Sequence, residues 1–264
     1  MDANIFHRVV NSDTEANRQH DWIRVVKAAE IKSMLPALID NEIKTSWVHE
    51  SSMQLGGDAF DYWWVDDNHF AVYLLDVCGH GVGVGPALLS IAVANVMRSR
   101  ALPNTDFSDP IQVLKGLNHA FPMEEHKGMF FTIWYGVYNK TTRQLVYASG
   151  GHPPAVLITE SLKGTNILQL KTPGFVIGGM AETQFFSASC YVEKFSKLYL
   201  FSDGVYEINK PNGTMLELSE FVKILAQPSL PGISDVARIR HFAQELNGTG
   251  PFADDFSLIQ ILFT

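Results

Sequence analysis

The pattern of hydrophobic and polar positions changes near residue 45 of the 264-residue chain. Over residues 21–44, apolar residues recur with helical spacing, and Pro36 is expected to kink or split that helix. Beyond residue 45, short segments rich in aromatic and β-branched residues follow one another, which is typical of strands. The expected strands are 47–55, 59–65, 69–77, 129–139, 143–150, 154–160, 187–194, 196–203 and 254–263.

Four segments between these strands have a helical pattern. The expected helices are 84–100, 109–121, 217–227 and 232–247. Asp109 and Pro110 suit the N-cap and first-turn positions of the second helix. Because most strands follow another strand directly, the sheets are expected to be antiparallel. The chain is therefore predicted to be an α+β protein, an antiparallel β-sandwich flanked by helix pairs.

The chain is expected to divide into two parts. Residues 1–44 would form a polar segment and a helix, and residues 45–264 would form the main domain. Residues 1–20 are polar and are expected to be poorly ordered. Two interpretations of the helix stay open. The helix would be either a core element of the domain or the connection to a partner or to an upstream regulatory domain.

Composition and charge narrow the class of protein. With 46% hydrophobic and 18% charged residues, the chain has the composition of a globular protein and not of a disordered one. The formal net charge of −8 argues against binding to nucleic acid or to an anionic membrane surface. Cys78 and Cys190 are too few for a disulfide framework, and no apolar segment is long enough to span a bilayer. We therefore expect a soluble cytoplasmic protein.

Five aspartates lie at the ends of apolar segments, next to small residues. They are Asp58, Asp76, Asp203, Asp254 and Asp255. Carboxylates that converge at such positions repel one another, and Mg²⁺ or Mn²⁺ would offset that repulsion because hard cations take oxygen ligands. Each aspartate taken alone is also compatible with an ordinary turn, so spacing alone leaves both interpretations open.

Six ordered motifs carry a resemblance to a known family. They are GGDAFDYW, LLDVCGHGVG, MFFTIWYGV, YASGGHPPAVL, LYLFSDGVYE and DDFSL. Together they resemble the metal-dependent PP2C-type (PPM) serine/threonine phosphatases, and most closely the bacterial branch typified by sporulation stage II protein E and RsbU. The resemblance extends from about Ala28 to Phe263.

The resemblance implies a site with two or three Mn²⁺ or Mg²⁺ ions. Asp76 matches the acid that bridges two metals, and the carbonyl of Val77 would bind one of them. Asp203 and Asp254 match the acids that complete the set of the second metal. Asp58 matches an acid near the first metal that can act through a water. Asp76 and Asp58 would be the catalytic residues, and the reaction would be attack of a metal-bridged water on a phosphomonoester.

Two positions, Asp255 and Cys78, depart from the pattern of the family. Asp255 lies where many relatives carry Asn, so it ranks below Asp254 as a metal ligand. Cys78 occupies the position of a His that is proposed as general acid in eukaryotic members, and His80 lies two residues further on. The bacterial branch generally lacks that His, so we expect His80 to be a turn residue and Cys78 a small residue that fills space.

Two other motifs have a structural and a functional interpretation. His152 in GGHPP could contact a phosphate, but a turn that links two strands is favoured. The glycine-rich segment TPGFVIGG, residues 172–179, is either a flap over the substrate or an ordinary loop.

The resemblance implies a phosphoprotein phosphatase that acts on a phosphorylated STAS-type regulatory protein, an anti-sigma-factor antagonist. It also implies control by an upstream sensor or receiver domain through the N-terminal helix, and it leaves open a homodimer formed through that helix. Because so few residues precede the main domain, the chain is expected to be a free-standing phosphatase or an excised output domain.

Two alternatives come from other functional classes. GGDAF is similar to the GGDEF motif of diguanylate cyclases, but Ala59 replaces an acid that those enzymes need. The other alternative is a catalytically silent binding module with the phosphatase fold. Such a module would lack a metal acid, whereas all the expected acids are present.

Overall fold

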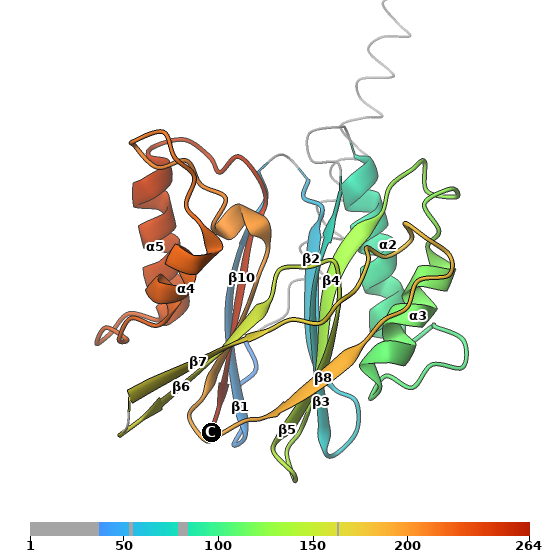
Figure 1. The fold of residues 1–264 in the computed structure, drawn as a ribbon, viewed down its shortest axis with the longest axis horizontal. Helices are drawn as coiled ribbons and strands as arrows, with labels where there is room; N and C mark the ends of the chain where they lie inside the picture. Colours follow the sequence, from blue (N-terminus) through green and yellow to red (C-terminus); the bar gives the residue numbers. More distant parts are fainter. Residues whose placement is uncertain (1–36, 53–54, 79–83, 163) are drawn as a thin grey trace, which may run out of the picture.

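The computed structural model describes residues 37–52, 55–78, 84–162 and 164–264. In this part of the chain, two five-stranded antiparallel sheets lie face to face (Figure 1). Sheet 1 has the strand order β1 (Ile43–Glu50), β10 (Phe256–Phe263), β9 (Lys197–Phe201), β6 (Ala155–Ser161) and β7 (Gly164–Leu170). Sheet 2 has the strand order β2 (Asp58–Trp64), β3 (His69–Val77), β4 (Phe131–Asn139), β5 (Gln144–Gly150) and β8 (Ser187–Tyr191).

Helices cover both outer faces of the sandwich (Figure 1). Helices α2 (Gly85–Ser99) and α3 (Pro110–Ala120) lie against sheet 2, and α4 (Leu218–Leu225) and α5 (Asp235–Asn247) lie against sheet 1. This arrangement confirms the predicted α+β sandwich flanked by helix pairs. Within the described part of the chain, no helix is long and apolar enough to cross a lipid bilayer.

Most expected strands and helices are found within a few residues of their predicted limits. The expected strand 69–77 is β3, and Asp109 caps α3 by accepting hydrogen bonds from the first N–H groups of that helix. The hydrophobic pattern does not predict β7, because every residue of that strand except Leu170 is exposed. This strand forms through antiparallel pairing with β6, which a local pattern of apolar residues does not signal.

The helix predicted over residues 21–44 is wrong in its last part. The chain makes a turn there, and β1 begins at Ile43. The carboxylate of Asp40 accepts hydrogen bonds from the N–H groups of Glu42 at 2.8 Å and Ile43 at 2.6 Å, so local side-chain bonds replace the helical ones. Residues 21–36 lie outside the described part, and the predicted division into an N-terminal segment and a main domain stays a prediction.

The space between the sheets is apolar along most of its length. In β3, Val72 and Leu74 point into this space, while Tyr73 and Leu75 point toward α2 and α3. Both faces of β3 are therefore buried, which explains its continuous hydrophobic sequence. The inward-facing position that follows Leu74 is Asp76, so the lining of the space becomes polar at this end of the sandwich.

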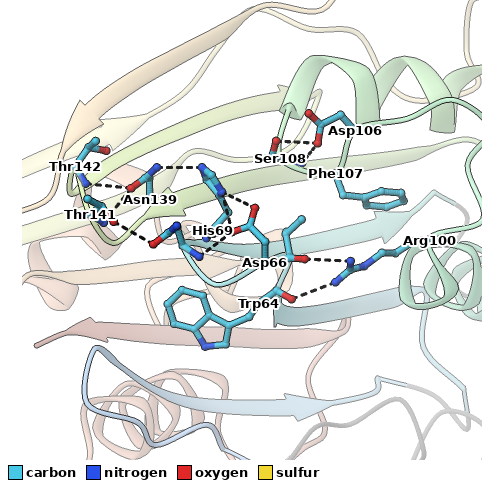
Figure 2. Close-up of polar contacts among 12 residues, drawn as sticks. Trp64, Asp66, His69, Arg100, Asp106, Phe107, Ser108, Asn139, Thr141 and Thr142 are labelled. Carbon is cyan, nitrogen blue, oxygen red and sulfur yellow. Dashed lines mark hydrogen bonds and ion pairs between the residues drawn. The ribbon is translucent and has the colours of Figure 1, made fainter.

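The opposite end of sheet 2 contains the turn between β2 and β3 (Figure 2). Oδ1 of Asp66 accepts hydrogen bonds from the N–H groups of Asn68 at 2.7 Å and His69 at 2.9 Å. Nδ1 of His69 lies 2.8 Å from Oδ2 of Asp66, and Nε2 lies 3.0 Å from the amide nitrogen of Asn139. The carboxylate of Asp66 and the ring of His69 therefore have partners close in the sequence or on β4.

Candidate active site

Two of the predicted acids face each other at the polar end of sheet 2. Asp58, the first residue of β2, is directly opposite Asp76 of β3. Asp76 is in turn opposite Thr132 of β4. Residues that are directly opposite in antiparallel strands share one face of the sheet. This face is the inner one, because Phe60 and Leu74, two residues from the acids, belong to the core between the sheets.

Sheet 1 places the other acids at the same end of the sandwich. Asp203 follows β9, and Asp254 and Asp255 precede β10. These two chain segments are joined by Ser202, whose Oγ donates to the carbonyl of Asp255 at 3.0 Å and accepts from the N–H of Ser257 at 3.1 Å. A side chain on Gly204 would overlap the carbonyl oxygen of Asp255, so glycine is required for this close approach.

The pKa shifts show that the acids from both sheets lie close together. Burial raises the pKa of Asp76 to about 7, and three neighbouring carboxylates add to the rise. These carboxylates belong to Asp203, Asp254 and Asp255. Burial also raises the pKa of Asp58 well above its ordinary value, with further contributions from Asp76 and Asp255. We call the five residues the acidic cluster: Asp58, Asp76, Asp203, Asp254 and Asp255. Without a cation, the mutual repulsion of their carboxylates opposes full ionisation of the cluster.

Asp203 also has a raised pKa, and the main cause is again burial. The charge of Asp254 is the next contribution, followed by that of Glu207. The acidic cluster therefore brings together residues that are separated by almost two hundred positions in the sequence. This proximity is what the hypothesis of a cation site requires of the predicted acids.

Asp255 differs from the other members of the cluster because both of its carboxylate oxygens accept hydrogen bonds from backbone N–H groups. Oδ1 accepts hydrogen bonds from the N–H of Ser52 at 2.8 Å and from its Oγ at 3.0 Å. Oδ2 accepts a hydrogen bond from the N–H of Gly57 at 2.6 Å. Asp255 therefore holds the loop that enters β2 and so helps to position Asp58. Its predicted place among the metal ligands stays a prediction.

The donor set of the acidic cluster fits a hard cation. Oδ1 of Asp58 is buried and has no hydrogen-bond partner, and such an oxygen is available to an ion or to a water bound to it. The carbonyl oxygen of Val77 lies beside Gly57, where a Cβ would come within 3.0 Å of it. Carboxylate and carbonyl oxygens are the ligands that Mg²⁺ and Mn²⁺ prefer.

The side chains of the cluster do not enclose an ion by themselves. Among the described residues, no three His, Cys, Asp or Glu side chains stand in an arrangement that could hold a metal ion. An ion at this site would therefore also use backbone carbonyls and waters, as Mg²⁺ usually does.

His152 contacts Thr132, the residue of β4 that is opposite Asp76. It is buried, and Nδ1 of its ring is 2.8 Å from Oγ1 of Thr132. Burial lowers the pKa of His152 to about 3, so the ring is neutral and offers no positive charge to a phosphate. The structure therefore favours the interpretation of GGHPP as a turn between strands.

The structure also places the remaining candidates. Sγ of Cys78 accepts a hydrogen bond from the N–H of Phe130 at 3.3 Å, consistent with a space-filling residue at a strand end. His80 lies outside the described residues.

In the glycine-rich segment, Ile177 exchanges two backbone hydrogen bonds with Phe131, the first residue of β4. Phe175 of the same segment is 49% exposed, so this segment is anchored beside the site and carries an exposed ring.

Sequence reasoning missed several polar residues around the cluster. Ser257 and Ser202 connect the strand ends of sheet 1, and Ser257 also donates to Asp58. Ser257 lies in the DDFSL motif, two residues after Asp255, so a signal for it existed. His49 of β1, which contacts Ser257, has no such signal because it lies within an ordinary strand pattern.

Comparison with known proteins supports this description of the fold. RsbU of Bacillus subtilis (strain 168), a phosphoserine phosphatase, is 29% identical over 208 residues, which cover 78% of this chain and 59% of RsbU. The SiaA-PP2C domain of Pseudomonas aeruginosa matches with a TM-score of 0.73 and 16% identity, covering 96% of this chain and 99% of that domain. The crystal structure of RsbX in complex with magnesium matches with a TM-score of 0.60 and 19% identity, covering 88% and 100% of the two chains.

The chain also matches a family model, that of stage II sporulation protein E (SpoIIE), over residues 66–263. This range contains every member of the acidic cluster except Asp58. The match extends over most of the chain, and the solved structures share its sandwich of two sheets. The protein is therefore a member of the stage II sporulation protein E family, with a PP2C-type fold.

Proposed function

We propose that the protein is a divalent-metal-dependent phosphatase that hydrolyses phosphoserine or phosphothreonine in a protein substrate. The observation that carries the proposal is the acidic cluster itself, in which burial and neighbouring carboxylates raise the pKa of Asp76 to about 7. Such a cluster is electrostatically unfavourable at neutral pH unless a cation binds. The similarity to RsbU, a phosphoserine phosphatase, supports the choice of reaction.

Each residue of the site has a proposed role. Asp76, Asp203, Asp254 and the carbonyl of Val77 would hold two ions, with a third left open. When bound, the ions would supply a water of lowered pKa and would neutralise the phosphoryl oxygens. Asp58 would accept a hydrogen bond from the attacking water through its unpartnered Oδ1. The water oxygen would bond to phosphorus as the bond from phosphorus to the serine or threonine oxygen breaks. A proton released by that water would pass to the leaving oxygen, which departs as a hydroxyl.

The substrate and its control are also part of the proposal. The substrate would be a phosphorylated STAS-type regulatory protein, an anti-sigma-factor antagonist, and activity would respond to an upstream sensor or receiver domain. The chain spans 59% of the length of RsbU, so these features rest on similarity to part of a relative. Removal of residues 1–44 tests the proposed control, because unchanged turnover together with an unchanged association state would contradict it.

The decisive experiment is hydrolysis of p-nitrophenyl phosphate by the wild-type protein and by Asp76→Asn, with Mn²⁺ or with EDTA. We expect turnover that requires Mn²⁺ and that Asp76→Asn removes. Asp66→Asn is a matched control because this aspartate lies at the opposite end of β2 and β3 and is hydrogen-bonded within its own turn. Wild-type protein that binds Mn²⁺ without turnover would contradict the proposal and favour a silent binding module.

A further inference from the structure

A chain of hydrogen bonds leads from β1 to Asp58. Oγ of Ser257 donates to Oδ2 of Asp58 at 2.6 Å. Nδ1 of His49 lies 2.8 Å from the same Oγ, and Oγ of Ser51 lies 3.3 Å from Nε2 of His49. Ser257 is fully buried, and His49 is directly opposite it in the pairing of β1 with β10. The chain therefore crosses from sheet 1 to the acid that sheet 2 contributes.

The direction of these bonds follows from the number of available protons. A serine hydroxyl has one proton, and an ionised carboxylate only accepts hydrogen bonds. With Asp58 as a carboxylate, the proton of Ser257 is used on Oδ2, so Nδ1 of His49 must be the donor to Ser257. When Nδ1 carries the only ring proton, Nε2 accepts from the hydroxyl of Ser51. In that tautomer all three bonds are directed toward Asp58.

We propose that His49 and Ser257 are positioning residues that orient Asp58 toward the metal site. Their hydrogen bonds use Oδ2 of Asp58, which leaves the buried Oδ1 as the oxygen directed at an ion or its water. The inference rests on the proposed function and adds to it a second layer of residues around the acids. Partners of this kind commonly change metal affinity by about 10- to 100-fold when they are removed.

Two structural features make His49 suited to this role. Its ring packs edge-on against Phe60 of β2, with 6.3 Å between ring centroids, so the ring is fixed by contact with the opposite sheet. The backbone of Ser257 is held by Ser202, which accepts a hydrogen bond from its N–H at 3.1 Å. The ring of His49 and the residue Ser257 are therefore both held in place by contacts other than the bond to Asp58.

The test compares His49→Phe with His49→Asn. Phenylalanine keeps a ring against Phe60 but has no donor, whereas the amide of Asn can place a donor near the position of Nδ1. Mn²⁺ affinity is measured by calorimetry, and kcat and KM are measured with p-nitrophenyl phosphate. We expect His49→Phe to weaken Mn²⁺ binding about 10-fold and to lower kcat with little change in KM, and His49→Asn to stay within about threefold of the wild type.

Equal losses in His49→Phe and His49→Asn would overturn the proposal, because a purely structural role does not depend on the donor. An unchanged His49→Phe would overturn it as well. Ser257→Ala in combination with His49→Phe should cost little more than either change alone, since both act through one bond to Asp58. Additive losses would contradict a common pathway.

A second measurement needs no variant. In the wild-type protein with Mg²⁺, ¹⁵N NMR of the imidazole of His49 should show a proton on Nδ1, and a neutral ring protonated only on Nε2 would overturn the proposal.

The outcomes of these experiments also distinguish the positioning role from the proposed phosphatase function on which it rests. Wild-type protein without Mn²⁺ binding and without turnover contradicts both, whereas active wild-type protein with an unaffected His49→Phe contradicts only the positioning role.

Discussion

The two ends of strands β2 and β3 carry aspartates with opposite electrostatic properties. At one end, Asp58 faces Asp76, and burial together with neighbouring carboxylates raises the pKa of both. At the other end, Asp66 is exposed, and hydrogen bonds lower its pKa, led by the one from the N–H of Asn68 and followed by the one from the side chain of His69 (Figure 2).

This difference separates an aspartate whose hydrogen bonds are satisfied within its own turn from aspartates that lack such partners. Asp66 has donors from its own turn and needs no other partner. Asp76 is surrounded by other acids, and Asp58 keeps a buried oxygen without a partner. A bound cation would offset this arrangement, which is why the acidic cluster is the proposed cation site.

Replacement of the central acid should have the largest effect on activity. We expect Asp76→Asn to lower kcat/KM at saturating Mn²⁺ by at least about 1,000-fold, equivalent to about 4 kcal/mol, because the residue would contact both ions. Asp66→Asn should stay within about twofold of the wild type, since it lies at the far end of the strands. Comparable losses in the two variants, measured with p-nitrophenyl phosphate, would remove the distinction between the two ends.

The contribution of Asp76 to the stability of the metal-free protein should fall as the pH rises from about 4 to 7. The pKa of Asp76 is about 7 in the folded protein and near its ordinary value of 3.8 in the unfolded chain. Between these values the folded state binds more protons, so the free energy of unfolding decreases with pH, by up to about 4 kcal/mol for this residue. Urea unfolding of the wild type and of Asp76→Asn in EDTA measures this contribution as the difference between the two proteins, because the lowered pKa of His152 adds the opposite pH dependence to both.

Mn²⁺ provides the control for the pH dependence. A bound cation favours the ionised carboxylates, so saturating Mn²⁺ should stabilise the wild-type protein most at neutral pH and reverse the loss seen in EDTA. Asp76→Asn should gain much less from Mn²⁺. A difference between the wild type and Asp76→Asn that stays constant from pH 4 to 7 in EDTA would show that Asp76 does not destabilise the metal-free fold.

Replacement of Asp255 should combine a loss of stability with a moderate loss of activity. In Asp255→Asn, either orientation of the amide places an NH₂ group against a backbone N–H, that of Ser52 or that of Gly57. An unsatisfied buried donor costs about 1–3 kcal/mol, and the loop that positions Asp58 would shift. We expect about a 10-fold lower kcat, with chemical denaturation to measure stability. Ser52→Ala, which removes only one hydroxyl, should have a smaller effect on both.

The smallest effect should come from the turn at the far end. Asp66→Asn keeps one oxygen that can accept from the N–H groups of Asn68 and His69, so the turn should persist. We expect a fall in Tm that is smaller than that of Asp255→Asn, with unchanged Mn²⁺ affinity. A large change in Mn²⁺ affinity, measured by calorimetry, would show that the two ends are coupled through β2 and β3.

The fold was largely predictable because hydrophobic periodicity reports burial. Segments such as 69–77 are apolar on both faces, which matches a strand covered by a sheet on one side and by helices on the other. Periodicity failed where burial was not the cause of the structure. It missed the exposed β7, and it assigned a helix to the segment before β1, where the side chain of Asp40 makes a turn.

The sequence by itself determined most of the strands, the helix pairs and the acids at the strand ends, because these depend on local periodicity and composition. The tertiary structure decided which acids meet. It aligns Asp58 with Asp76 across two strands, and it brings Ser257 to Asp58 from 199 positions away in the sequence. It also shows that Asp255 uses both carboxylate oxygens on the loop before β2. Burial, hydrogen-bond partners and pKa depend on the packing of the two sheets, and a linear pattern does not contain them.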